Sequence, residues 1–184
     1  LDDGIVYSTD DAVRRLHRPR RYEGNPVLKV DRPWESAGGG VYLFGGTVLY
    51  DEEDGVFKMW YRASSPTGHG PTGLGEGGYK ACYATSTDGL TWEKPNLGLR
   101  EIDGSKDNNV LPPAKDGMQF IRRPNLIKDY EESDPERRYK MIYMDNIEGS
   151  WGLSKGFSAD GMHWDMNVGE PHRFERPVAP NGVL

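Results

Sequence analysis

A two-fold internal repeat constrains the fold of this chain more than any other feature of its sequence. The segment GTVLYDEEDGVFKMWYRA at 46–63 matches PNLIKDYEESDPERRYKMIYMD at 124–145. Downstream, YKACYATSTDGLTWEK at 79–94 matches WGLSKGFSADGMHWDM at 151–166. The chain therefore contains two copies of one structural unit, and any proposed fold must explain both.

Each copy has the sequence pattern of two consecutive β-hairpins. The first hairpin joins two apolar strands through a turn rich in Asp, Gly, Pro and Glu, and the second turns at an Asp-Gly pair. Asp-Gly between strand residues favours a hairpin, because glycine tolerates a positive φ and Asp accepts hydrogen bonds from the following backbone. Each unit is therefore predicted to form four antiparallel strands. Since Asp88 recurs as Asp160, we interpret Asp88 as a turn residue and not as a catalytic acid.

Tandem four-stranded units are typical of a β-propeller, in which each sheet packs its faces against its neighbours. We expect a lead-in at 1–23, a first unit at 24–107, a second unit at 108–180 and the start of a third at 181–184. The alternative all-β fold, a two-layer β-sandwich, does not explain the repeat. Propellers typically have about 4 to 8 units. The sequence thus predicts either a fragment of a longer protein or a homo-oligomer, a dimer or higher, that covers the open faces.

The composition agrees with an all-β fold and argues against several classes of partner. The chain has 24 Gly, 13 Pro, 10 Tyr and 5 Trp, which favour short strands and turns over helices. Its net charge of −6 argues against nucleic acid, and no apolar run approaches the roughly 18 residues that would span a membrane. The single cysteine, Cys82, excludes an internal disulfide and suits a small buried side chain. We expect no metal and no cofactor, and the cellular compartment stays open between secreted, periplasmic and other locations.

Three segments resemble the N-terminal part of five-bladed β-propeller glycosidases: GNPVLKVDRPWE, GTVLYDEEDGVFKMWYRA and YATSTDGLTWEKPNLG. They are similar to the family 32 and family 43 glycoside hydrolases, and NPVL and PWE also resemble the family 130 mannoside phosphorylases. The resemblance implies an oligosaccharide ligand in a funnel lined by the innermost strands, with carboxylates from the first three blades. Gly45 and Gly46 stand where family 32 enzymes carry their first Asp, and Arg123 stands where they carry the second. The resemblance therefore implies a carbohydrate-active protein and leaves open whether this chain is an enzyme.

The direction of the strands predicts at which end of its unit each loop lies. In an antiparallel meander the first and third turns lie at one end, so the acids of 51–55 and 132–138 are expected to be solvated turn residues away from the ligand. The opposite, ligand-facing end is predicted to collect the lead-in 30–36, the glycine-rich segment 64–78 and the segment 145–150. Long loops without regular structure often bind ligands.

Two carboxylates at the predicted ligand-facing end, Glu35 and Asp145, are candidate catalytic residues. A glycosidase needs two carboxyl groups about 5 to 5.5 Å apart for retention or about 6.5 to 9.5 Å apart for inversion. Each candidate has a structural alternative. Glu35 could form an ion pair with Arg32 or Arg62, and Asp145, which replaces Ala63 of the first unit, could begin a turn.

Four further residues at this end are candidate carbohydrate-binding residues: Trp34, Arg62, His69 and Arg123. Trp34 has no counterpart in the repeat and could stack on a sugar ring or pack in the core, whereas Trp60, Trp92 and Trp164 are expected to be core residues. The arginines have forked donors that suit hydroxylated or anionic ligands, with structural ion pairing as the alternative. His69 could bind substrate or lie exposed in its loop.

Two other functions fit the same sequence. The first is a non-catalytic carbohydrate-binding or assembly module, derived from a glycosidase propeller that has lost its acids. The second is a sialidase-like propeller, because STDGLTW resembles the Asp-box of those folds. The segment is one residue shorter between Asp and Trp than that motif, and the arginine triad of sialidases is not located in this chain.

Overall fold

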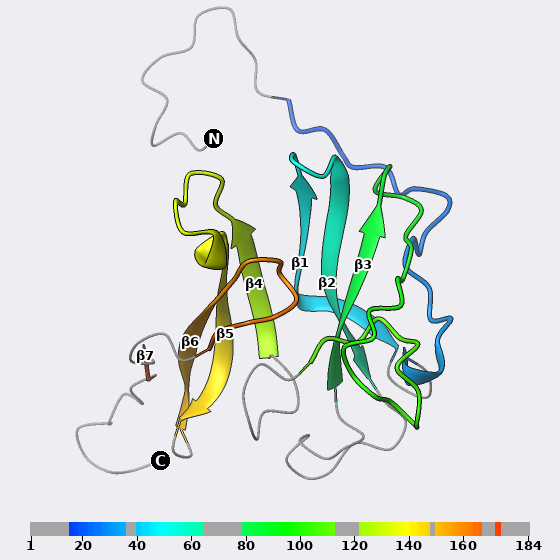
Figure 1. Ribbon diagram of the computed structural model, residues 1–184. Coiled ribbons are helices and arrows are strands. Elements are labelled where there is room, and N and C mark those ends of the chain that lie inside the picture. The colour runs from blue at the N-terminus through cyan, green and yellow to red at the C-terminus, as the bar shows by residue number, and fades with distance from the viewer. Residues whose placement is uncertain are drawn as a thin grey trace, which may run out of the picture.

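Two antiparallel β-sheets form most of the described part of the chain (Figure 1). The computed structural model describes residues 15–35, 40–64, 79–112, 122–147, 150–166 and 172–173. In chain order the elements are the 3-10 turn η1 (Pro33–Glu35), β1 (Val41–Asp51), β2 (Val56–Ser64), β3 (Tyr79–Ser86), β4 (Arg122–Lys128), the 3-10 turn η2 (Pro135–Arg137), β5 (Tyr139–Ile147), β6 (Ser150–Ser158) and β7 (His172–Arg173). The described residues contain no α-helix, and the all-β prediction is confirmed. None of them belongs to a helix long and apolar enough to cross a membrane.

The two sheets follow the sequence repeat. The first has the strand order β1-β2-β3 and the second the order β4-β5-β6-β7, with every neighbouring pair antiparallel. In the first sheet, two isolated bridges take the place of a regular fourth strand beside β3. They join Thr85 to Glu93 and Cys82 to Val110, and a loop lies between Glu93 and Val110. The stretch 108–111, which the repeat assigned to the second unit, therefore still contacts the first sheet.

The two Asp-Gly turns have the same hydrogen bonds. In the first turn, Oδ1 of Asp88 accepts from the backbone N–H groups of Thr91 at 2.7 Å and Leu90 at 2.8 Å, and these bonds lower the pKa of Asp88 to about 2. Asp160 accepts the equivalent backbone bonds in the second turn. Gly89 has a φ of 71°, in the left-handed region that favours glycine. The prediction that Asp88 is a turn residue is confirmed.

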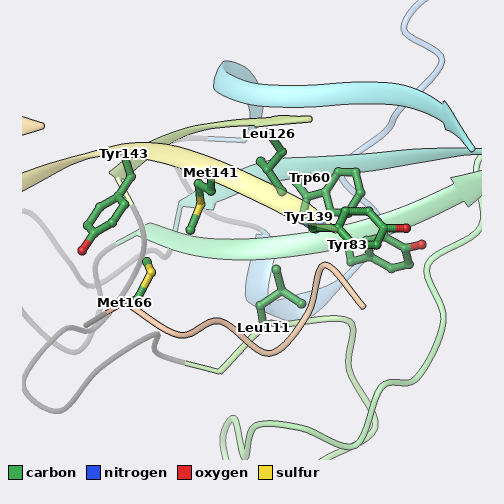
Figure 2. Packing of buried hydrophobic residues seen from close by; sticks show 8 residues of the cluster. All are labelled: Trp60, Tyr83, Leu111, Leu126, Tyr139, Met141, Tyr143 and Met166. Carbon is green, nitrogen blue, oxygen red and sulfur yellow. The ribbon is translucent and has the colours of Figure 1, made fainter. Parts of the chain in front are cut away.

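The main hydrophobic core lies between the two sheets. Trp60 on β2 is 2% exposed, and its indole N–H donates to the carbonyl oxygen of Gly161 at 2.7 Å, so the turn of the second unit closes over the first. The innermost strands also meet, because the Thr47 hydroxyl on β1 accepts from the backbone N–H of Leu126 on β4 at 3.0 Å. The prediction that Trp60 is a core residue is confirmed. Figure 2 shows the eight buried residues of this core: Trp60, Tyr83, Leu111, Leu126, Tyr139, Met141, Tyr143 and Met166.

A second core covers the opposite face of the first sheet. Its buried residues come from β2, β3 and the chain after them: Met59, Tyr61, Ala63, Cys82, Ala84 and Val110. Leu28, Trp34 and Trp92 pack against these residues, so the lead-in and the second hairpin cover this face. Cys82 is fully buried, and burial raises the pKa of its thiol to about 12, as expected for an unreactive core cysteine.

A buried carboxylate joins the two units at the end that carries the β1–β2 turn. Asp51 is fully buried and accepts hydrogen bonds from the ammonium groups of Lys58 at 2.6 Å and Lys128 at 2.7 Å, and from the Tyr139 hydroxyl at 2.8 Å. Lys128 and Tyr139 belong to the second unit. The expectation that the acids of 51–55 are solvated is therefore wrong for Asp51, whose charge is neutralised by lysines from both sheets.

Candidate functional site

The strands end in two groups, as the antiparallel pattern predicted. In Figure 1 the β1–β2 turn and the turn after β3 lie at the same end of the first sheet. The opposite end has the start of β1, the end of β2 and the start of β3, and it is the end predicted to face a ligand. Any site built on the innermost strands must therefore use the first residues of β1 and β4.

Both innermost strands break register at this opposite end. The pairing of β1 with β2 shifts between Tyr42 and Thr47, and the pairing of β4 with β5 shifts between Arg122 and Asn125. Such irregularities bend a strand and re-aim its side chains, and they are common beside active sites. In the first unit the irregularity includes Gly46, where a side chain would collide with the backbone oxygen of Trp60. Close backbone packing thus explains why the first unit has no side chain at this position.

Arg123 and Asp145 lie near the same level of the second sheet. Arg123 falls inside the irregular stretch of β4, and Asp145 pairs with Gly152 across β5 and β6. Strand β5 continues to Ile147, so Asp145 lies within a strand and does not begin a turn, the structural alternative considered for it. The side chains of Arg123 and Asp145, and the whole of His69, lie outside the described part of the structure.

Arg62 lies at the corresponding end of the first sheet. It is paired with Tyr42 on β1 and Ala81 on β3. Its guanidinium carbon is 5.6 Å from the centre of the Tyr42 ring, a distance at which cation and aromatic face attract. The Tyr42 ring therefore helps to hold the guanidinium at the end predicted to face a ligand.

Glu35 is fully buried and is hydrogen-bonded by four protein donors. Its Oε1 accepts from the Tyr61 hydroxyl at 2.6 Å, and its Oε2 accepts from the Lys94 ammonium at 2.7 Å. Oε2 also accepts from the backbone N–H groups of Asp31 at 3.1 Å and Arg32 at 3.2 Å. The carboxylate therefore fastens η1 and the lead-in to β2. Its ion-pair partner is Lys94, which sequence reasoning did not nominate.

Trp34 is held by the same cluster. Its indole N–H donates to Oδ1 of Asn109 at 2.9 Å, and its ring packs against the second core. Asn109 in turn donates to the Tyr61 hydroxyl at 2.6 Å and to the backbone oxygen of Tyr83 at 2.7 Å. Trp34 is half-buried in these contacts. Sequence reasoning did not nominate Asn109.

The structure does not bring Glu35 and Asp145 together. Glu35 bonds Tyr61, which points to the second core, whereas Trp60 points to the opposite face and to the second sheet. The first sheet therefore separates Glu35 from β5. Among the described residues, no group of three or more His, Cys, Asp or Glu side chains is arranged to hold a metal ion.

Comparison with solved structures identifies the class of fold. A candidate glycoside hydrolase from Bacteroides ovatus superposes with a TM-score of 0.51 at 19% identity, over 82% of this chain and 40% of that one. A second structure, with a TM-score of 0.50 and 18% identity over 90% of this chain and 42% of that one, comes from work on family 130 of mannoside phosphorylases, which contains glycoside hydrolases that target β-1,2-mannosidic linkages in Candida mannan. The chain therefore has a propeller-type fold, as the repeat predicted, and this fold is glycoside hydrolase-like, as the resemblance of its segments implied.

The same comparisons show how much of each matched structure this chain covers. The chain spans about two-fifths of the length of the two structures it matches. No family model matches the sequence, and no curated protein matches it either. Because both identities are below 25%, the likeness defines the fold and not the activity.

Proposed function

We propose that this chain is part of a carbohydrate-active protein that binds oligosaccharides at the end of the sheets where β1 and β4 break register. The observation that carries the proposal is the matching position of these two irregularities, between Tyr42 and Thr47 and between Arg122 and Asn125. Two neighbouring inner strands that re-aim their side chains at the same end form a natural ligand surface. The glycoside hydrolase-like fold supports an oligosaccharide as the ligand.

Three residues of this end have the chemistry that sugar hydroxyls require. Arg62 and Arg123 offer forked N–H donors, and Asp145 offers carboxylate acceptors. Asp145 is also a place where the repeat is broken, since the first unit has Ala63. We assign these three residues to ligand binding, with Asp145 as the carboxylate acceptor among them.

Binding is supported better than hydrolysis. Hydrolysis needs a second carboxyl group within about 10 Å of the first. Glu35 is buried, bonded by four donors and separated from β5 by the first sheet. A catalytic pair therefore requires a carboxylate from elsewhere, and a non-catalytic carbohydrate-binding module is the second candidate function, favoured by the saturated hydrogen bonding of Glu35.

Isothermal titration calorimetry on the full chain tests the proposal. The probes are β-1,2-linked mannooligosaccharides and fructooligosaccharides, and we expect Asp145→Asn and Arg123→Gln to weaken binding at least tenfold. Arg138→Gln is the matched control, because Arg138 lies in the second unit at the opposite end and pairs with Glu53. Absence of binding to both probes at millimolar concentration would refute the proposal, as would equal weakening by the control.

Product analysis on the same probes separates the two candidate functions. Release of shorter sugars that Asp145→Asn abolishes would assign hydrolysis, with Asp145 as one of its two acids. Binding without release over a day, in a protein whose unfolding temperature is unchanged, would assign the binding module.

A further inference from the structure

Lys80, on β3, is a buried lysine without a carboxylate partner. The residue is 7% exposed. Within the described ranges of the chain, its ammonium group makes no hydrogen bond and no ion pair. Lys58 and Lys94 are buried to a similar degree, but each bonds a buried carboxylate. Because burying an unpaired charge is costly, Lys80 destabilises the fold unless it loses its proton or gains an anion.

A second positive charge lies beside Lys80. Burial and, after it, the charge of Arg100 lower the pKa of the Lys80 ammonium group, so the two cations are close enough to repel each other. Burial also lowers the pKa of the Arg100 guanidinium. Like charges that are shielded from water repel each other strongly at short range. The two side chains therefore make a local positive site in a chain whose net charge is −6.

Hydrogen bonds within its own loop hold Arg100 in place. Figure 1 shows the chain after β3 running back toward the end at which β3 begins. The side-chain amide of the buried Asn108 donates to the backbone oxygens of Arg100 at 2.8 Å and Ser105 at 3.1 Å. Ile102 exchanges two backbone bonds with Ser105 and packs against the second core. The loop therefore presents Arg100 to Lys80 in a fixed position.

Lys80 lies on the face of the first sheet that the lead-in covers. It pairs with Ala63 of β2, a residue of the second core, whereas the neighbouring Arg62 points to the opposite face. As the second residue of β3, Lys80 is at the end predicted to face a ligand. The position is therefore separate from the oligosaccharide surface proposed above, which uses Arg62, Arg123 and Asp145.

We propose that Lys80 and Arg100 form a binding site for an oxyanion group, a carboxylate, sulfate or phosphate. The ammonium group has three N–H donors, and the guanidinium has five in a planar fork that matches such oxygens. Arg100 can therefore donate to an anion while it keeps its other contacts. Two sources carry this chemistry, a free inorganic anion and an acidic sugar. The inference does not depend on the oligosaccharide surface, because it uses different residues on the other face of the sheet.

Thermal unfolding of the full chain with and without sulfate tests the site. Chloride keeps the ionic strength of the two buffers equal, so that screening is the same. Sulfate also stabilises folded proteins in general, and the comparison is therefore with Lys80→Met. A ligand that binds only the folded protein raises its Tm. We expect about 20 mM sulfate to raise the Tm of the parent chain by at least about 3 °C more than that of Lys80→Met.

The Tm of Lys80→Met without sulfate is a second measurement. Methionine replaces an unpaired buried charge by an apolar side chain of similar length, so the variant should be at least as stable as the parent chain. A lysine that served only the fold would show the opposite result. A lower Tm of Lys80→Met without sulfate overturns the proposal, as does an equal rise in both proteins with sulfate.

Two variants of the neighbouring loop complete the test. Lys106→Met is the matched control, because it makes the same change of charge at an exposed lysine, and it should keep the rise. Asp103 is exposed and raises the pKa of Lys80 without forming an ion pair with it. Asp103→Asn should therefore increase the rise, since it removes a carboxylate that competes with the anion. Equal loss of the rise in Lys80→Met and Lys106→Met overturns the proposal.

Isothermal titration calorimetry with galacturonate, oligogalacturonate and galactose separates the two sources. Tighter binding of oligogalacturonate than of sulfate, weakened at least tenfold by Lys80→Met, would assign the anion to an acidic sugar. Binding of sulfate that is as tight as that of either uronate would assign a free anion. Galactose, which has no charge, should not bind at this site. Absence of binding by sulfate and by both uronates overturns the proposal, and the result with neutral oligosaccharides does not affect it.

Discussion

Replacing Asp51 by asparagine should destabilise the contact between the two units more than any other isosteric change at their shared end. Asp51 is fully buried, and the ammonium groups of Lys58 and Lys128 both donate to it. Asparagine keeps the shape and removes the charge. Its amide nitrogen would also place a donor against a lysine that is itself a donor.

The magnitude follows from the burial of the two lysines. Removing one partner of a buried ion pair costs about 3 to 5 kcal/mol, because it leaves an uncompensated charge in the interior. Lys58 also bonds Asp54 and Lys128 also bonds Glu53, which soften the loss, so we expect the lower part of this range, about 3 kcal/mol. That value is a large fraction of the stability of about 5 to 15 kcal/mol that is typical of a domain.

Urea unfolding followed by tryptophan fluorescence measures this change, because Trp60 lies between the two sheets. Asp54→Asn is the control: Asp54 also bonds Lys58 but is 56% exposed, so its loss should cost less than about 1 kcal/mol. Adding Lys128→Met to Asp51→Asn should recover part of the stability, since it removes one of the stranded charges. A value for Asp51→Asn within 1 kcal/mol of the parent chain, or equal to that of Asp54→Asn, would refute the reasoning.

The pH dependence of unfolding provides a second measurement on Asp51. Burial alone would raise the pKa of this carboxyl, but hydrogen bonds from Lys128, Lys58 and Tyr139 hold it well below its usual range. A lowered pKa stabilises the fold fully above the unfolded value of about 3.9, and the stabilisation is lost as the pH falls toward the folded pKa. The parent chain should therefore lose more stability than Asp51→Asn between pH 5 and pH 2.5. Parallel curves for the two proteins would contradict this assignment.

Three further changes test the packing of the two cores. Gly161→Ala should lower the free energy of unfolding by more than Gly89→Ala. Both glycines have a positive φ, but a side chain at Gly161 would also lie 2.7 Å from the Trp60 ring. Urea unfolding of the two variants measures the difference. Trp60→Phe should cost about 1 to 3 kcal/mol through the lost bond to Gly161 and the smaller ring, measured by thermal unfolding followed by circular dichroism. Glu35→Gln should cost up to about 3 kcal/mol, because the buried Lys94 then keeps only the exposed Asp31 as its ion-pair partner, and an unchanged Tm would show that Glu35 does not fasten the lead-in.

The parts of the fold that repeat could be predicted from the sequence. The Asp-Gly turns, the alternation of strands and the burial of Trp60 all follow from local patterns that occur in both units or from periodic apolar residues. The ion pair of Glu35 with Lys94 could not be predicted, because the two residues are 59 positions apart and the pair has no counterpart in the repeat. Asp51 was misjudged for a related reason. Its turn composition indicates exposure, and the lysine that buries it comes from the other unit.

Only part of the proposed ligand surface could be predicted from the sequence. The pairing of strands indicated which end of the sheets Arg62 and Asp145 occupy, and this end is the one observed. The register shifts of β1 and β4 are hard to predict from the sequence, since they depend on how each strand pairs with the neighbouring strand. From the sequence, Gly46 was interpreted only as a position that lacks the first Asp of family 32 enzymes. Its close approach to the backbone of Trp60 gives it a packing role that no local pattern reveals.

The differences between the two units carry more information than their similarity. In both units a lysine of the second strand pairs with an acid near the end of the first strand, Lys58 with Asp51 and Lys140 with Asp129. Lys128 and Tyr139 of the second unit also contact Asp51 of the first. The first unit has Tyr50 at the position of Lys128, and its corresponding face is covered by the lead-in instead. Lys128 thus neutralises the buried Asp51 of the first unit, and Tyr50, its counterpart in the first unit, has no charge with which to make the same contact.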